Sequence, residues 1–222
     1  MTSAAPMLRA RAILFDIDGT LVDSTPVVER SWRTWAQEYG VDADEVLRVC
    51  HGRRTEDTVA EFVAPQQLEV AVARLQALEL ADFDGVTALP GAQQILEALT
   101  PQRWAAVTSG ERDLMTGRLS AAHLPIPETM ICAEDVTVGK PSPEGYLLAA
   151  AALGLDAKHC VVVEDAPAGI AAGLTAGARV VAVTTTHTAD QVADADVIVA
   201  DLSCVSVGLT DDGVVLVRLE SS

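Results

Sequence analysis

The chain has 222 residues, a hydrophobic fraction of 50% and a formal net charge of −17. This length can form one core domain with a smaller satellite, and the hydrophobic fraction excludes a disordered chain. The acidic balance argues against a nucleic-acid partner, and no apolar run approaches the roughly 20 residues that span a bilayer, so no membrane partner is expected either.

The cysteines and the N-terminal residues bear on the compartment. The four cysteines are far apart and form no CxxC pair, and Cys132 and Cys160 lie in apolar, strand-like runs. Reduced thiols in a core are therefore expected, rather than disulfides or zinc ligands. No secretory hydrophobic segment precedes the first apolar run. We expect a cytoplasmic protein.

The first predicted element is a buried parallel strand over Ala12–Phe15. Asp16 and Asp18 follow it, and Gly19 permits a sharp turn. Two carboxylates two residues apart point to the same side of an extended chain. They repel one another unless a cation lies between them or one keeps its proton.

The next stretch, from residue 25 to about residue 87, has a helical pattern and no strand pattern. We predict an inserted helical domain at 25–87, between the two parts of a core domain, 8–24 and 88–222. The expected helices cover Pro26–Tyr39 (ended by Gly40), a short segment capped by Asp42, a segment capped by Thr55, and Pro65–Leu80.

From residue 88 onward strand and helix patterns alternate, which predicts a parallel α/β sheet of Rossmann-like type with helices on both faces. The last two apolar runs flank an Asp-Gly turn, which predicts a terminal hairpin. Strands are expected at 105–107, 130–132, 160–163, 179–183 and 197–199, the hairpin at 205–209 and 214–219, and helices at 92–99, 112–122, 143–153 and after residue 165.

Polar residues follow three of the predicted strands, where the working residues of such sheets gather. They are Asp16 with Asp18, Thr108 with Ser109, and Glu164 with Asp165; a lysine, Lys140, precedes a helix. Each could be an ordinary cap, strand end or surface charge. Together they predict a carboxylate site for Mg²⁺ beside hydroxyl, backbone N–H and ammonium groups that can hold a phosphoryl group.

These four motifs, in this order, resemble the haloacid dehalogenase superfamily of phosphatases, in the subgroup with an α-helical cap inserted after the first motif. The resemblance implies that Asp16 is the nucleophile and forms an aspartyl-phosphate, and that Asp18 is the general acid and then the base. It implies that Thr108, Ser109 and Gly110 bind the phosphoryl group and that Lys140 stabilises its charge. The implied Mg²⁺ ligands are the Asp16 carboxylate, the Asp18 carbonyl, Asp165, and Glu164 either directly or through its neighbours.

A closer resemblance is to glycerol-3-phosphate and 2-deoxyglucose-6-phosphate phosphatases. It rests on the segments HGRRT, VTSGERD, GKPSPEGYL and VVVEDAPAGIAAG. The implied partner is a small phosphorylated sugar or polyol, with His51, Arg53 and Arg54 as candidate substrate contacts; ordinary loop structure is the alternative for His51 and Arg53. Arg54 is the preferred contact, because its forked guanidinium suits phosphate and hydroxyl oxygens. The oligomeric state stays open.

Three other functions compete with this interpretation. A β-phosphoglucomutase-like sugar phosphomutase shares the scaffold, but such relatives carry a histidine where this chain has Val28 and a valine where it has Thr20. A dehalogenase lacks the second aspartate. A phospho-receiver protein uses similar residues but is much shorter and has no inserted helices. These differences favour hydrolysis.

Overall fold

The core of the molecule is a six-stranded parallel sheet. The computed structural model describes residues 7–50, 52–210 and 213–219. The sheet has the order β6-β5-β2-β7-β8-β9, and each neighbouring pair is parallel. The predicted α/β class is thus confirmed. The strands are β2 (Ala12–Phe15), β5 (Trp104–Val107), β6 (Met130–Ile131), β7 (Cys160–Glu164), β8 (Arg179–Val183) and β9 (Val197–Val199).

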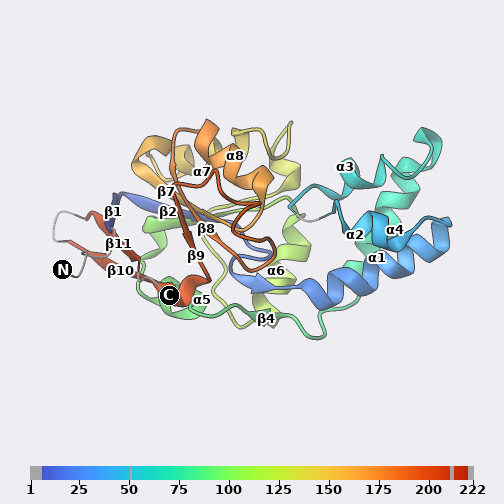
Figure 1. Ribbon diagram of the computed structural model, residues 1–222, viewed down its shortest axis with the longest axis horizontal. Helices are drawn as coiled ribbons and strands as arrows, with labels where there is room; N and C mark the ends of the chain where they lie inside the picture. The colour runs from blue at the N-terminus through green and yellow to red at the C-terminus, as the bar shows by residue number, and fades with distance from the viewer. Residues whose placement is uncertain (1–6, 51, 211–212, 220–222) are drawn as a thin grey trace.

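Helices cover both faces of this sheet (Figure 1). Successive side chains of a strand point to opposite faces, so β2 contributes Ile13 and Phe15 to one hydrophobic core and Ala12 and Leu14 to the other. The first core includes α5 (Ala92–Glu97) and α6 (Arg112–Ala121). The second includes α7 (Glu144–Ala152) and α8 (Pro167–Thr175).

A second, three-stranded sheet closes the first core. The predicted hairpin is present as β10 (Val205–Leu209) and β11 (Val215–Leu219), which pair antiparallel. A strand that the sequence analysis did not predict, β1 (Met7–Ala10), pairs with the other edge of β11. With four residues it is too short to be recognised from a local pattern, and its partner strand lies at the other end of the chain.

The predicted helical stretch forms α1 (Thr25–Tyr39), α2 (Ala43–Leu47), α3 (Thr55–Val59) and α4 (Leu68–Leu80). This group, hereafter the helical unit, has a hydrophobic core of its own around Trp32, Trp35 and Leu75. Asp42 caps α2 by accepting from two backbone N–H groups, as predicted. Two details were wrong: Thr55 is the first residue of α3 rather than its cap, and residues 65–67 form a 3₁₀ turn before α4.

The chain enters and leaves the helical unit through two neighbouring segments. β3 (Val22–Asp23) and β4 (Thr87–Ala88) pair antiparallel, so the entry and the exit lie side by side. Figure 1 shows the helical unit beside the sheet, joined to it at this point.

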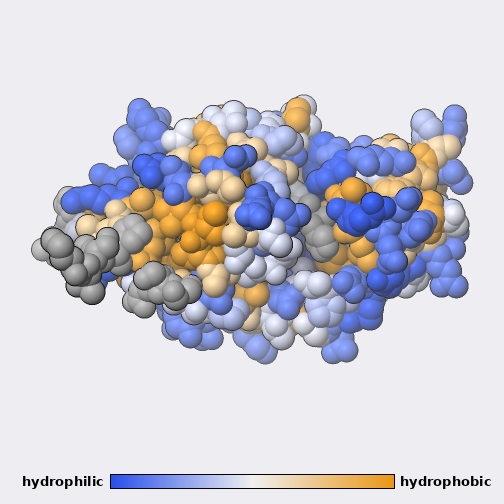
Figure 2. All heavy atoms as spheres, viewed as in Figure 1, coloured by the Kyte–Doolittle hydropathy of each residue, from blue (hydrophilic) through white to orange (hydrophobic). Residues whose placement is uncertain are grey.

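The surface of the molecule and its cysteines can be compared with what the composition predicts. In Figure 2 hydrophilic side chains lie around most of the edge of the visible face, and hydrophobic side chains gather nearer its middle. Cys50, Cys132 and Cys160 are buried and reduced. Within the described residues, no helix has the length and the apolar character needed to cross a membrane.

Candidate active site

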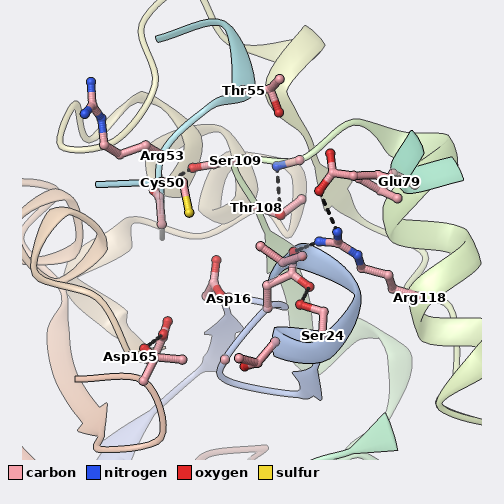
Figure 3. A pocket seen from close by; sticks show the side chains of 18 of the residues that line it. Asp16, Ser24, Cys50, Arg53, Thr55, Glu79, Thr108, Ser109, Arg118 and Asp165 are labelled. Atoms are coloured by element: carbon pink, nitrogen blue, oxygen red, sulfur yellow. Dashed lines mark hydrogen bonds and ion pairs between the residues drawn. The ribbon is translucent and has the colours of Figure 1, made fainter. Parts of the chain in front are cut away.

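The predicted site residues meet at the carboxyl edge of the parallel sheet. Asp16 follows β2, Thr108 follows β5 and Glu164 ends β7; β2 lies between the other two strands, so the three ends are neighbours. A pocket between this edge and the helical unit contains many of the predicted residues (Figure 3). Its lining includes Asp16, Asp18, Thr108, Ser109, Gly110, Asp165 and Arg53.

Lys140 joins two of the buried carboxylates. Its Nζ lies 2.5 Å from Asp16 Oδ1 and 2.6 Å from Glu164 Oε1, and it donates to the Val107 carbonyl at 3.2 Å. Tyr146 donates its hydroxyl to the same Glu164 oxygen at 2.7 Å. Burial alone would lower the pKa of Lys140, but the carboxylates of Asp16 and Glu164 outweigh it and raise the pKa. Lys140 is therefore a fixed cation beside Asp16.

One ammonium group cannot balance the carboxylates here. Carboxylate oxygens of Asp16, Glu164 and Asp165 lie within 4.8 Å of one another. Burial raises the pKa of Asp16 well above its usual value and that of Asp165 to about 7, and the neighbouring carboxylates add to both shifts. Buried, repelling oxygen donors of this kind fit Mg²⁺, which prefers carboxylate and phosphate oxygens. The donor set therefore fits the predicted ion.

Glu164 is fixed more tightly than its neighbours. Its Oε2 accepts from the backbone N–H groups of Asp165 and Ala166 at the start of α8, while Oε1 accepts from Lys140 and Tyr146. A Cβ on Gly169 would lie 1.7 Å from Glu164 Oε1, so this position in α8 has no room for a side chain. Because four donors already bond its two oxygens, Glu164 is better placed to orient its neighbours than to turn toward an ion.

Asp18 is held by two partners that the sequence analysis did not single out. Ser24 Oγ donates to Asp18 Oδ1 at 2.7 Å, and Arg118 of α6 lies 2.5 Å from Asp18 Oδ2. The guanidinium also lies 2.9 Å from Oε1 of Glu79, on α4 of the helical unit. Asp18 is thus connected to the opposite wall of the pocket through one buried arginine.

Backbone and hydroxyl groups after β5 form the part of the pocket that suits a phosphoryl group. Thr108 Oγ1 accepts from the Gly110 N–H at 3.0 Å, which fixes the turn before α6. Ser109 Oγ donates to the carbonyl of Gly52, in the helical unit, at 3.0 Å. This bond brings the loop before α3 against the sheet edge and helps to cover the site.

The three candidate substrate contacts of the helical unit differ in placement. His51 lies outside the described residues. Arg53 lines the pocket, but its guanidinium extends away from Asp16 (Figure 3) and lies 2.6 Å from Glu61. Arg54 does not line this pocket: its guanidinium makes two hydrogen bonds to Asp57, at 2.9 and 3.0 Å. Arg54 lines a neighbouring cavity together with Ser109 and Lys140, and Asp57, one helical turn away, holds its guanidinium. Its role as the preferred substrate contact stays a prediction.

Comparison with known proteins agrees with this geometry. Residues 10–177 match a family model described as haloacid dehalogenase-like hydrolase. The chain belongs to the haloacid dehalogenase-like hydrolases. It is 40% identical to hexitol phosphatase A of Escherichia coli, in an alignment that covers 95% of this chain and 100% of the relative. It is 35% identical to glycerol-1-phosphate phosphohydrolase 1 of Saccharomyces cerevisiae, in an alignment that covers 94% of this chain and 89% of the relative. A hydrolase from Pseudomonas syringae has a similar structure: TM-score 0.78, 26% identity, covering 86% of this chain and 94% of that one.

These findings confirm the family prediction, and the curated relatives are named as phosphatases, in agreement with the predicted enzyme class. In this haloacid dehalogenase-like chain, residues in and beside the pocket nevertheless escaped the sequence analysis. Thr186, in the loop after β8, donates its hydroxyl to Asp165, and Thr185 donates to the Gly19 carbonyl. The signal was the run of three threonines, residues 184–186, which directly follows the predicted strand at 179–183.

Arg118 left a fainter signal. It lies on the buried face of α6 with Met115 and Leu119, and the residue is only 3% exposed. A charged residue on an apolar helical stripe indicates a buried partner. That partner, Glu79, belongs to the same kind of stripe on α4, far away in the sequence, so local patterns could not pair them.

Proposed function

We propose that this haloacid dehalogenase-like chain is a Mg²⁺-dependent phosphatase that hydrolyses small sugar or polyol phosphates through an aspartyl-phosphate, with residues 25–87 as its cap domain. The observation that carries the proposal is the contact of Lys140 with Asp16 at the carboxyl edge of the sheet, beside Thr108 and the backbone after it. A buried carboxylate with an adjacent fixed cation can attack a phosphorus atom without being repelled by the phosphate.

In the first step a carboxylate oxygen of Asp16 forms a bond to phosphorus, and the bond from phosphorus to the alkoxide oxygen breaks. The Thr108 hydroxyl and the backbone N–H groups around Ser109 hold the phosphoryl oxygens. Lys140 offsets the charge on Asp16 and on the transferring group. Asp18 donates a proton to the departing alkoxide.

In the second step Asp18 accepts a proton from a water molecule, whose oxygen attacks the phosphorus of the aspartyl-phosphate. The Asp16 carboxylate leaves, and inorganic phosphate is released. The carboxyl of Asp18 thus returns to its protonated state, so the cycle is balanced. The role is supported by the contacts of the Asp18 carboxyl with Ser24 and Arg118 and by its lining the same pocket as Asp16.

The residues that would hold Mg²⁺ are the carboxylates of Asp16 and Asp165 and the main-chain carbonyl of Asp18. Glu164 would orient this set through its bonds to Lys140 and to the start of α8. When bound, the ion would supply charge that lets a phosphate dianion enter a cluster of carboxylates.

Two observations support a small polyol or sugar phosphate as substrate and hydrolysis as the reaction. The relatives at 40% and 35% identity are named for hexitol and glycerol-1-phosphate substrates. Val28 lines the pocket where phosphomutase relatives carry a histidine. A valine can neither position nor deprotonate a sugar hydroxyl, so water is the expected acceptor of the phosphoryl group.

The experiment is a hydrolysis screen over phosphate esters with and without Mg²⁺, with p-nitrophenyl phosphate as the generic substrate. We expect phosphate release that chelation abolishes and Mg²⁺ restores; full activity after exhaustive chelation contradicts the proposed ion. Phosphorus NMR with a hexose 1-phosphate primed by a bisphosphate separates the reaction classes. Growth of a 6-phosphate signal without free phosphate would show a mutase.

A further inference from the structure

Glu79 occupies the wall of the pocket that the helical unit contributes. It lies in the last turn of α4 and is 5% exposed. Figure 3 shows Glu79 and Arg118 on one wall, with Asp165 across the pocket from them. Burial raises the pKa of Glu79, an effect that Arg118 opposes, and a carboxylate near a helix C-terminus also opposes the helix dipole. A neutral glutamine would avoid both costs at this position.

Glu79 shares its cation with Asp18. The Arg118 guanidinium lies 2.9 Å from Glu79 and 2.5 Å from Asp18, so one cation serves two carboxylates. The pocket has one other arginine among its described lining residues, Arg53, whose guanidinium is paired with Glu61. Glu79 therefore presents a carboxylate to the part of the pocket beyond the phosphoryl site, beside a guanidinium whose hydrogen bonds it shares with Asp18.

Neutral side chains also line this wall of the pocket. Val28, Trp32 and Leu114 give it an apolar surface, and Thr55 adds a hydroxyl. A polyol chain fits such a surface, because its C–H groups can contact the apolar side chains while its hydroxyls donate to a carboxylate. A leaving group with its own negative charge would meet Glu79 in a partly desolvated pocket, where repulsion is stronger than in water.

We propose that Glu79 is a specificity-determining residue: its carboxylate accepts hydrogen bonds from hydroxyls of an uncharged polyol leaving group and excludes leaving groups that carry a carboxylate or a second phosphate. This inference rests on the proposed function and adds the charge class of the substrate to it. Arg118 holds the Glu79 carboxylate in place through Oε1.

The test compares two substrates that differ at one carbon. Glucitol 6-phosphate has a hydroxymethyl group at C1, and gluconate 6-phosphate has a carboxylate there. We expect the wild-type enzyme to prefer the polyol phosphate by about 30-fold or more in kcat/KM. Glu79→Gln keeps the shape and removes the charge, so it should narrow this preference by about tenfold, with a rise in kcat/KM for gluconate 6-phosphate.

The matched control is Glu69→Gln, on the same helix, which makes the same change in net charge at an exposed position outside the pocket. It should leave the preference unchanged. Glu79→Asp keeps the charge and should retain the exclusion of gluconate 6-phosphate. A rise in activity toward one substrate is a result that a merely damaged fold cannot give.

Hydrolysis of p-nitrophenyl phosphate, whose leaving group in the bound ester is uncharged, tests the phosphatase activity itself. If the wild-type enzyme hydrolyses that ester but shows no preference between the two hexose derivatives, the role of Glu79 is overturned while the proposed function stands; this comparison needs no variant to fold. An equal loss on all three esters in Glu79→Gln also overturns it, because Glu79 would then act only on Asp18 through Arg118. A wild-type enzyme that hydrolyses none of the esters refutes the proposed function and this inference with it.

Discussion

The two walls of the pocket are built differently. On the sheet side Asp16 and Glu164 lie at the ends of central strands, are almost completely buried, and share one lysine. On the side of the helical unit, Arg53 lies on a loop and Glu79 at the end of a helix. Arg53 is paired with Glu61 of the same unit, and Glu79 with Arg118 of the core. In the proposed function the sheet side, with its buried and tightly bonded carboxylates, carries the reaction, and the side of the helical unit contacts the leaving group.

The largest effect is expected for the nucleophile, and it tests the sheet side of this comparison. Asp16→Asn removes the attacking charge while keeping the shape, so kcat/KM for p-nitrophenyl phosphate should fall by about 10⁴-fold or more. Thermal unfolding should show no loss of stability, because one of three repelling carboxylates is gone. Asp113→Asn, at an exposed position of α6, is the matched control. Substantial activity in Asp16→Asn would assign the nucleophile elsewhere.

Lys140→Met should have the next largest effect. The buried ammonium is the only described cation bonded to Asp16, so its loss should lower kcat/KM by about 10²- to 10³-fold. It also leaves two buried carboxylates unpaired, which should lower the free energy of unfolding by about 3 kcal/mol near neutral pH. Urea unfolding measures the second effect. Lys158→Met, which removes an exposed lysine paired with Asp156, should change neither quantity.

The sequence predicts the two sides of the pocket to different extents. Asp16, Thr108 and Asp165 could be placed together because buried strands and the residues that follow them are local patterns, and parallel strands align their carboxyl ends. The pairing of β1 with β11 and the pairing of Arg118 with Glu79 could not be predicted, because each joins residues that are far apart in the sequence. Such contacts are decided by tertiary packing, which no local pattern records.

Binding of Mg²⁺ should be linked to pH through Asp165. Burial raises the pKa of Asp165 to about 7, from 3.8, and the Glu164 carboxylate adds to the shift. The folded protein therefore holds this proton more tightly than the unfolded chain does, so the carboxyl stabilises the metal-free fold below about pH 4 and loses that contribution as the pH rises through 7. Mg²⁺ must displace the proton, so its affinity should rise by up to about tenfold per pH unit below 7.

Calorimetric titration of Mg²⁺ in buffers of different ionisation heat measures the protons released. We expect release below pH 7 and a larger Mg²⁺-induced rise in Tm near pH 8 than near pH 5.5. Asp165→Asn should reduce both the affinity and the proton release. An affinity that is independent of pH in the wild-type protein would remove Asp165 from the ion's ligands.

The smallest effect is expected for Arg54, on the side of the helical unit. Because Asp57 holds its guanidinium and it lies outside the pocket, Arg54→Ala should change kcat/KM for glucitol 6-phosphate by less than about threefold. The free energy of unfolding should fall by about 0.5 kcal/mol. A loss of about tenfold or more on that substrate, with p-nitrophenyl phosphate hydrolysis retained, would instead make Arg54 a substrate contact.

The most direct test of the account is to trap the covalent intermediate in Asp18→Asn. With p-nitrophenyl phosphate as substrate, the leaving group needs little help from an acid, so the Asp16 carboxylate can still take the phosphoryl group, whereas the attacking water has lost its base. Intact-mass analysis during turnover should show one added phosphoryl group, located at Asp16 by peptide mapping and absent from Asp16→Asn. An Asp18→Asn protein that never gains this mass while it still hydrolyses the ester would contradict the account, because hydrolysis would then proceed without an aspartyl-phosphate whose breakdown depends on Asp18.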